Sequence, residues 1–197
     1  MDNFLEDAMD FSDPNESSKP VKSNDVIKTA IISPCKKYRY ILSRSWNDYK
    51  PGELVFIMLN PSTADDTIDD PTIRRCMGFS KREGYSGISV INLFAYRATN
   101  PQELYQAEDP IGEDNNPTIL NYMLHAQDDE ISGIKKIICA WGTHGSFNNR
   151  DKDIIQMAKE FKIDLYCLGK TKDGHPKHPL YIKKDQPIEI FKKYDEN

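Results

Sequence analysis

The stretch LVFIMLNPSTADDTIDDPTIRRCMGFSKREGYSGISVINLFAYRATN, residues 54–100, decides the fold. It contains an apolar run that ends at Asn60, a helix that begins at Asp70-Pro71, and a second apolar run that ends at Asn92. A short buried strand, a crossover helix and another buried strand are the sequence form of a parallel βαβ unit. Sheets built from such units bind their ligands at the carboxyl ends of the strands. The polar residues of this stretch fall there, which predicts a functional site at that edge.

The rest of the chain continues the alternation of strands and helices. An antiparallel strand is expected before the stretch, at residues 38–46, and two more parallel strands after it, at residues 135–141 and 164–168. Apolar residues at helical spacing predict helices at residues 99–104, 116–127 and 149–161. The pattern predicts a three-layer α/β/α sandwich with a mostly parallel central sheet of about four strands plus the N-terminal antiparallel strand.

Composition is typical of one globular domain, since 38% of the 197 residues are hydrophobic and 29% are charged. We expect residues 1–24 to be a disordered acidic tail and residues 25–197 to form a single α/β domain. No apolar run approaches the roughly 20 residues that a membrane helix needs, and the N-terminus does not resemble a signal peptide, so a cytoplasmic location without membrane contact is expected. The four cysteines form no CxxC pair, which favours reduced thiols.

Charge is unevenly distributed along the chain. Residues 1–20 hold six acids and one lysine, which equals the net charge of -5 of the whole protein. Residues 133–184 carry eleven bases and five acids. One hypothesis is that the acidic tail folds over this basic half as a phosphate mimic. The balanced charge of the remaining chain argues against a dedicated duplex-DNA binder.

Each predicted parallel strand is followed by a cluster of polar or aromatic residues. The four clusters are Asn60-Pro61-Ser62, residues 92–97, residues 141–144 and residues 175–179. Because the carboxyl ends of parallel strands meet at one edge of a sheet, we expect the four clusters to form one site.

Several motifs resemble a known family. The segments LNPSTAD, DDPTIRRC, INLFAYRAT, AWGTHG and HPLY resemble the DUF1643 family of bacteria and phages, over roughly residues 36–182. That family is similar, more distantly, to the uracil-DNA glycosylase superfamily. Residues 58–62 resemble the G-x-N-P-G motif that ends the first core strand of those enzymes, residues 92–99 resemble T-N-x-V-x-R-P-T, and residues 178–180 resemble H-P-S. Two departures are that Met58 replaces the first glycine and that the serine of the last motif is absent.

The resemblance implies a uracil-DNA-glycosylase-like fold and assigns roles to three residues. Asn60 would position a water molecule or hydrogen-bond a base, and His178 would donate to the oxyanion that develops on the leaving base. His175 could alternate with it as an acid or a phosphate ligand. The alternatives are that Asn60 caps the turn before Pro61 and that both histidines are ordinary loop residues.

The loop between the first strand and its helix is rich in carboxylates, with Asp65, Asp66, Asp69 and Asp70. Of these we assign Asp65 and Asp69 as candidate catalytic residues, because neighbouring carboxylates raise one another's pKa toward that of a general base. The loop could instead bind Mg²⁺, or be solvated with Asp70 as the helix cap. No resident metal or cofactor is assigned.

Phosphate and base ligands complete the expected site. Arg74, Arg75 and Arg97 are candidate phosphate ligands, since guanidinium pairs bidentately with phosphate, although a surface ion pair is the alternative. Of Phe94, Tyr96 and Trp141, we expect one to stack on a base and the others to belong to the core. The remaining residues expected to contact ligand are Pro61, Ser62, Asn92, His144 and His175.

Two functions remain open from the sequence. The first is a glycosylase-like enzyme that hydrolyses the N-glycosidic bond of a nucleotide or of a base in single-stranded or modified nucleic acid. The second is a non-catalytic module of the same fold that recognises a nucleotide or nucleic acid, for example in phage-host conflict. A third, a protein-interaction factor, rests only on the acidic segments.

Overall fold

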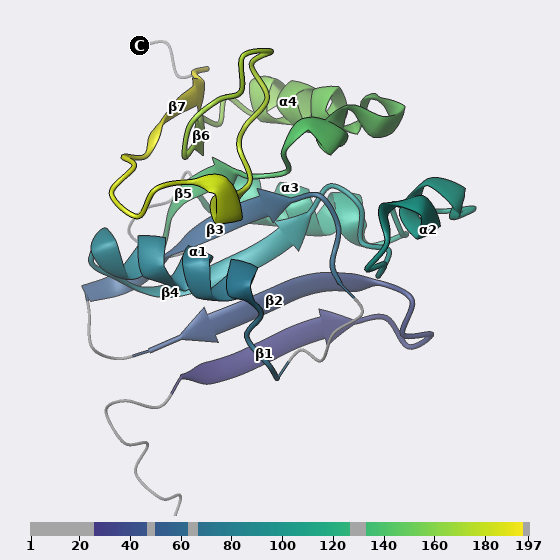
Figure 1. The fold of residues 1–197 in the computed structure, drawn as a ribbon, viewed down its shortest axis with the longest axis horizontal. Helices are drawn as coiled ribbons and strands as arrows, with labels where there is room; N and C mark the ends of the chain where they lie inside the picture. The colour runs from purple at the N-terminus through teal and green to yellow at the C-terminus, as the bar shows by residue number, and fades with distance from the viewer. Residues whose placement is uncertain (1–25, 47–49, 63–66, 127–132, 195–197) are drawn as a thin grey trace, which may run out of the picture.

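The computed structural model describes residues 26–46, 50–62, 67–126 and 133–194 (Figure 1). The predicted acidic tail lies outside these residues. The strands are β1 (Ile27–Ile32), β2 (Arg39–Ser45), β3 (Lys50–Met58), β4 (Tyr85–Asn92), β5 (Ile134–Cys139), β6 (Leu165–Cys167) and β7 (Glu189–Lys192). The α-helices are α1 (Pro71–Arg82), α2 (Pro101–Gln106), α3 (Asn115–His125) and α4 (Arg150–Glu160), and the 3-10 helices are η1 (Thr143–Asn149) and η2 (Pro179–Tyr181).

All the described strands belong to one seven-stranded sheet in the order β1-β2-β4-β3-β5-β6-β7. The pairs β3/β4, β3/β5 and β5/β6 are parallel, and β1/β2, β2/β4 and β6/β7 are antiparallel. The four parallel strands and the antiparallel strand before them are confirmed. The sheet is wider than predicted because it also contains β1 and β7, its two edge strands, whose side chains are mostly exposed.

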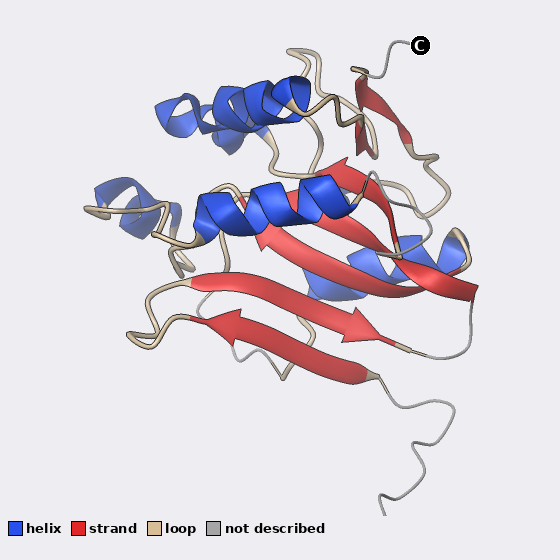
Figure 2. Ribbon diagram, turned by 180° about the vertical axis from the view of Figure 1, so that it is seen from behind, coloured by secondary structure: helices blue, strands red, loops and turns tan. Residues whose placement is uncertain are grey.

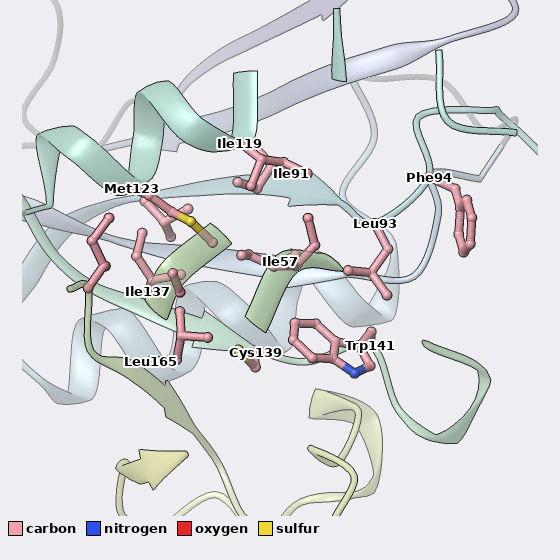
Figure 3. Packing of buried hydrophobic residues seen from close by; sticks show 14 of the residues in the cluster. Ile57, Ile91, Leu93, Phe94, Ile119, Met123, Ile137, Cys139, Trp141 and Leu165 are labelled. Carbon is pink, nitrogen blue, oxygen red and sulfur yellow. The ribbon is translucent and has the colours of Figure 1, made fainter. Parts of the chain in front are cut away.

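Helices cover both faces of the sheet, which confirms the three layers (Figure 2). On one face Ile73, Cys76 and Phe79 of α1 pack against Leu54 and Phe56 of β3. On the other face α3 and α4 contribute the buried side chains Ile119, Met123, Ile154 and Ala158. Figure 3 shows Ile119 and Met123 above Ile57, Ile91 and Ile137 of the three central strands. Because β3 is covered on both sides, its sequence is apolar throughout instead of alternating.

The crossover helix α1 begins as its sequence predicts. Asp70 is the N-cap, and its Oδ1 atom accepts a hydrogen bond of 2.8 Å from the backbone N–H of Ile73. Pro71 occupies the first turn, where its missing donor costs nothing. At the other end Gly84 has φ +79°, a left-handed conformation that glycine adopts without strain. The helix therefore returns the chain to the same edge of the sheet from which β3 started.

Candidate functional site

A pocket of about 540 Å³ lies at the carboxyl edge of the parallel strands. Its wall combines segments that follow β3, β5 and β6. The lining residues are Met58, Leu59, Asn60, Trp141, Gly142, Thr143, His144, Thr171, Lys177, His178 and Tyr181. The structure therefore brings together three of the four clusters that were expected to form one site.

Asn60 is half-buried where β3 ends, and its side chain has two distinct sides. The amide Nδ2 donates to the backbone carbonyls of Ala98, at 2.8 Å, and Pro61, at 3.2 Å. These two hydrogen bonds fix the turn at Pro61, which agrees with the alternative prediction that Asn60 caps this turn. They also occupy the donor group, and no described residue donates to Oδ1. What Asn60 offers to a ligand is thus a hydrogen-bond acceptor held in a fixed orientation.

His178 is half-buried at the start of η2. Its Nδ1 accepts a hydrogen bond of 3.4 Å from the backbone N–H of Leu180, so the proton of the neutral imidazole lies on Nε2. Burial lowers the pKa of His178 below its usual 6.5, and the carboxylate of Asp70 opposes this shift only in part. At neutral pH His178 is therefore an uncharged hydrogen-bond donor.

The segment WGTHG, residues 141–145, depends on its two glycines. Gly142 has φ +73° and ψ -163°, a conformation open essentially to glycine alone. Gly145 lies against the indole of Trp141, and a Cβ atom there would be 2.0 Å from Cδ1. Trp141 is 2% exposed, and its buried Nε1 has no hydrogen-bond partner among the described residues. The indole is thus a tightly packed part of the pocket wall, with 5.9 Å between its ring centroid and that of Phe191.

His144 reaches the pocket from η1 and is supported by an unexpected partner. Its Nδ1 is 2.8 Å from the hydroxyl of Tyr105 in α2, a residue that sequence reasoning did not single out. Thr171 and Tyr181 are also lining residues that had not been assigned to the site, and Lys177 lies within the expected cluster at residues 175–179 but had no assigned role. Lys177 and Tyr181 flank His178 within the motif that had been noted, so their proximity in sequence was a usable signal. No sequence signal pointed to Tyr105, because α2 is far along the chain from His144, its partner in the structure.

The cluster after β4 does not join the pocket. Asn92 is 2% exposed, and its backbone carbonyl accepts a hydrogen bond of 3.1 Å from Asn115. Phe94 is fully buried in the core and contacts Phe147. Arg97 donates to the carbonyl of Lys36 and lines a separate hollow of about 280 Å³. None of these three residues lines the pocket, although backbone hydrogen bonds from Leu93 and Phe94 to the carbonyls of Met58 and Leu59 hold the segment beside the end of β3. A role for them in the site stays a prediction.

One interaction that helps hold this part of the fold was not anticipated. Arg150, at the start of α4, is 3% exposed and donates from Nε to the carbonyl of Leu93 at 2.9 Å. Its guanidinium also donates to the side chain of Asn116. Asn115 donates to the same Leu93 carbonyl at 2.9 Å. Arg150 and Asn115 therefore fix the backbone of the segment that follows β4.

Asp69 lies outside the pocket, in an ion pair. Its carboxylate is 2.6 Å from Nε of Arg44, whose side chain is fully buried, and 3.0 Å from Nζ of Lys28. Burial alone would raise the pKa of Asp69, but these hydrogen bonds outweigh it and lower the pKa below its ordinary value. A carboxylate with a lowered pKa is a poor general base, so the assignment of Asp69 to catalysis is not supported by its surroundings. Asp65 and Asp66 lie outside the described residues.

The other predicted ligands surround the pocket without lining it. Pro61 is buried, Ser62 is half-buried, and His175 is half-buried in the turn that Thr171 caps through a hydrogen bond of 3.1 Å to the His175 N–H. Arg74 and Arg75 lie on α1. Of the three candidate stacking aromatics only Trp141 reaches the pocket, and Tyr181, 82% exposed, is the more accessible ring. Within the described residues no group of three His, Cys, Asp or Glu side chains is placed to hold a metal ion.

Comparison with known proteins identifies the family. The sequence model of a family described as a protein of unknown function, DUF1643, matches residues 39–180. The chain belongs to the DUF1643 family. The match runs from the start of β2 into η2 and includes every residue that lines the pocket except Tyr181. Searches of curated proteins and of solved structures find no match.

The described helices were also compared with the requirements for crossing a membrane. None of them is both long enough and apolar enough to do so.

Proposed function

We propose that this DUF1643 protein is a glycosylase-like protein whose pocket recognises a nucleobase, as a nucleotide or within a nucleic acid, and hydrolyses its N-glycosidic bond. The observation that carries the proposal is the pairing of Asn60 and His178 in one pocket: a fixed acceptor, Oδ1, and an uncharged donor, Nε2–H. The similarity of residues 58–62 and 178–180 to uracil-DNA glycosylase motifs supports the same assignment.

A hydrogen-bond acceptor and a hydrogen-bond donor in one pocket are complementary to a base edge that carries both a donor and an acceptor. A lactam, in which a ring N–H adjoins a carbonyl, offers a donor to Asn60 and an acceptor to His178. Uracil, thymine, guanine and hypoxanthine all carry such an edge. The exposed ring of Tyr181 supplies an aromatic surface on which the face of a base can stack for about 1–3 kcal/mol, while the buried indole of Trp141 forms part of the pocket wall.

The proposed reaction uses His178 at the leaving group. The bond between the sugar C1′ and the base nitrogen breaks with its electron pair moving onto the base. Negative charge then develops on the base carbonyl, and the Nε2–H of His178 stabilises it by a hydrogen bond. Water supplies the hydroxyl group to C1′ and a proton to the released base. Because the donor is already neutral and oriented, it needs no reorganisation during the reaction.

One observation favours a second candidate, recognition without cleavage. Among the described residues that line the pocket there is no carboxylate to activate water, and Met58 occupies part of its wall. A binding module needs only the Asn60 acceptor, the His178 donor and the aromatic surface. The two candidates therefore share a pocket and differ in whether product appears.

The test uses single-stranded and double-stranded DNA, RNA and free nucleotides that contain normal and modified bases. Released base is measured by mass spectrometry, and binding is measured in parallel for the wild type, Asn60→Ala and His178→Ala. Matched controls are Asn100→Ala, which removes a helix-capping side chain outside the pocket, and His125→Ala at the end of α3. Circular dichroism confirms that each variant is folded.

Release by the wild type that falls about a hundredfold or more in His178→Ala, with both controls unaffected, supports the enzyme. Binding without release that is lost in Asn60→Ala supports the module. Binding or release that is equally strong in both pocket variants and both controls contradicts the proposal in either form.

A further inference from the structure

A second concave surface adjoins the pocket, on the outer side of α1. This groove has a volume of about 660 Å³ and lies between the helix and the chain that follows η2, which are side by side in Figure 1. Its lining residues are Pro71, Arg74, Arg75, Gly78, Phe79, Arg82, Leu180 and Lys184. Because Pro71 and Arg82 are the first and last residues of α1, the groove follows the whole helix.

The groove is basic, with three arginines and a lysine and no carboxylate among its lining residues. Arg82 pairs with Glu83 at 2.6 Å, so its charge is largely offset. Arg75 donates to the carbonyls of Pro179 and Ile182, which orient its guanidinium without neutralising it. Arg74, which donates to the backbone carbonyl of Asp69, and Lys184 are exposed. Three positive charges thus remain available to an anion.

Packing holds Arg75, one of the three available cations, and Arg82, whose charge Glu83 offsets. The guanidinium of Arg75 lies 5.0 Å from the centre of the Phe79 ring, and that of Arg82 lies 5.1 Å from it. Hydrogen bonds from Arg82 to the carbonyls of Lys184 and Gln186 fix the opposite wall of the groove. Because its guanidinium is already oriented, Arg75 loses less entropy on binding an anion than a mobile surface lysine does.

Gly78 keeps the middle of the groove open. It lies inside α1, where glycine costs about 0.5–1 kcal/mol relative to alanine, yet a Cβ atom built there meets nothing within 4 Å. No packing contact of the described chain therefore requires glycine at this position. The open space at this position leaves room for an extended ligand backbone between the flanking arginines, even with an alanine methyl group present.

The groove and the pocket share one wall. Leu180 of η2 lines the groove, and its neighbours His178 and Tyr181 line the pocket. A chain that places one unit in the pocket therefore reaches the groove within a few residues of η2. We propose that the groove binds the phosphodiester backbone of single-stranded nucleic acid while one of its bases occupies the pocket. This inference rests on the proposed function and narrows its substrate from free nucleotides to a polymer.

Single-stranded rather than duplex nucleic acid fits these surfaces. The exposed ring of Tyr181 stands between groove and pocket, where it can stack only on a base that is not already stacked within a duplex. The electrostatic contribution is sequence-independent and makes binding salt-dependent, with a slope of about -0.7 in log K against log salt for each phosphate contacted by a single strand.

The test measures the affinity of the full chain for a fluorescent single-stranded DNA of about 12 nucleotides, within the range of site sizes known for single-strand binders. The matching duplex and a mononucleotide are measured alongside. Gly78→Glu fills the groove with a negative charge, and Gly78→Ala is its matched control. Arg74→Ala/Lys184→Ala removes two groove cations, and Lys152→Ala/Lys159→Ala removes two exposed cations from α4 on the opposite face of the sheet.

We expect Gly78→Glu to weaken single-strand binding about tenfold or more while Gly78→Ala binds as the wild type does. The groove double variant should reduce the magnitude of the salt slope by about 1.4, and the α4 double variant should leave it unchanged. Mononucleotide binding should be unaffected by all four groove and α4 variants and should be lost in Asn60→Ala and in His178→Ala. Equal single-strand affinity of Gly78→Glu and Gly78→Ala, or tighter binding of the duplex, overturns the inference.

The two proposals fail in different ways. If the groove variants alter single-strand binding while Asn60→Ala and His178→Ala do not alter base recognition, the groove assignment stands and the proposed function fails. If base recognition depends on Asn60 and His178 while a mononucleotide binds as tightly as the single strand, the function stands and the groove assignment fails.

Discussion

The contact between Gly145 and Trp141 makes a quantitative prediction about the pocket wall. In Gly145→Ala the new Cβ would lie 2.0 Å from Cδ1, 2.6 Å from Nε1 and 2.8 Å from Cγ of the indole. Ordinary carbon contacts are about 3.5–4.0 Å, so the ring or the η1 backbone must move by roughly 1.5 Å. The indole is 2% exposed and packed against Phe191, which leaves little room. Overpacking of this kind typically costs about 1–3 kcal/mol, and we expect the upper end.

The assay is thermal and urea unfolding of Gly145→Ala beside the wild type, followed by circular dichroism and tryptophan fluorescence. A loss of about 3 kcal/mol corresponds to a drop in Tm of roughly 6–12 °C for a domain of this size. The matched control is Gly78→Ala, the same chemical change at a glycine with open space around it. It should raise stability by about 0.5–1 kcal/mol, because alanine is the better helix former.

Gly145→Ala should therefore lower the stability of the protein, and Gly78→Ala should raise it. If Gly145→Ala is as stable as the wild type, the close packing of Trp141 against η1 is incorrect, and with it the shape of the pocket. If Gly78→Ala is destabilised as much as Gly145→Ala, the groove side of α1 is packed against something that the structure does not place there.

Two further predictions concern charged and titratable groups. In an NMR titration, His178 should show a pKa below 6.5, because burial disfavours the imidazolium. The unfolded chain then binds a proton at a higher pH than the folded chain does, so the contribution of His178 to stability is lost as the pH is lowered through 6.5. A pKa at or above 6.5 would contradict the assignment of His178 as a buried, uncharged donor. Asp69→Asn should lower the free energy of unfolding by about 2 kcal/mol, which is less than the roughly 3–5 kcal/mol for breaking a fully buried ion pair, because the Asp69 side chain is 19% exposed. Turnover per folded molecule should stay unchanged. Loss of turnover at unchanged stability would instead support a catalytic role for Asp69.

The central part of the fold was predictable because its signals are local. The apolar run of β3, the Asp70-Pro71 helix start and the helical spacing of Ile73, Cys76 and Phe79 all follow from burial and capping. The edge strands β1 and β7 were not predicted, since an edge strand buries little and its identity depends on the neighbour with which it pairs.

The candidate site was predictable at the level of the sheet edge and less so at the level of individual residues. Asn60, Trp141, His144 and His178 line one pocket because parallel strands end together. The β4 segment ends at the same edge, but Asn115 and Arg150 bind the carbonyl of Leu93 from outside the sheet. Such long-range contacts have no signature in the local sequence. The ion pair of Asp69 with Arg44 was missed for the same reason.

The central claim is that Asn60 and His178 recognise a base by hydrogen bonds to its lactam edge. The most direct test is to measure by calorimetry the binding of uracil, thymine, guanine and hypoxanthine, each beside its analogue methylated on the lactam nitrogen. Methylation removes the donor that Oδ1 of Asn60 accepts and leaves this acceptor unpaired, at a cost of about 1–3 kcal/mol. We expect at least one parent base to bind and its methylated analogue to bind about tenfold or more weakly. Equal affinity of each base and its methylated analogue, or no binding of any of the four bases, would contradict the claim.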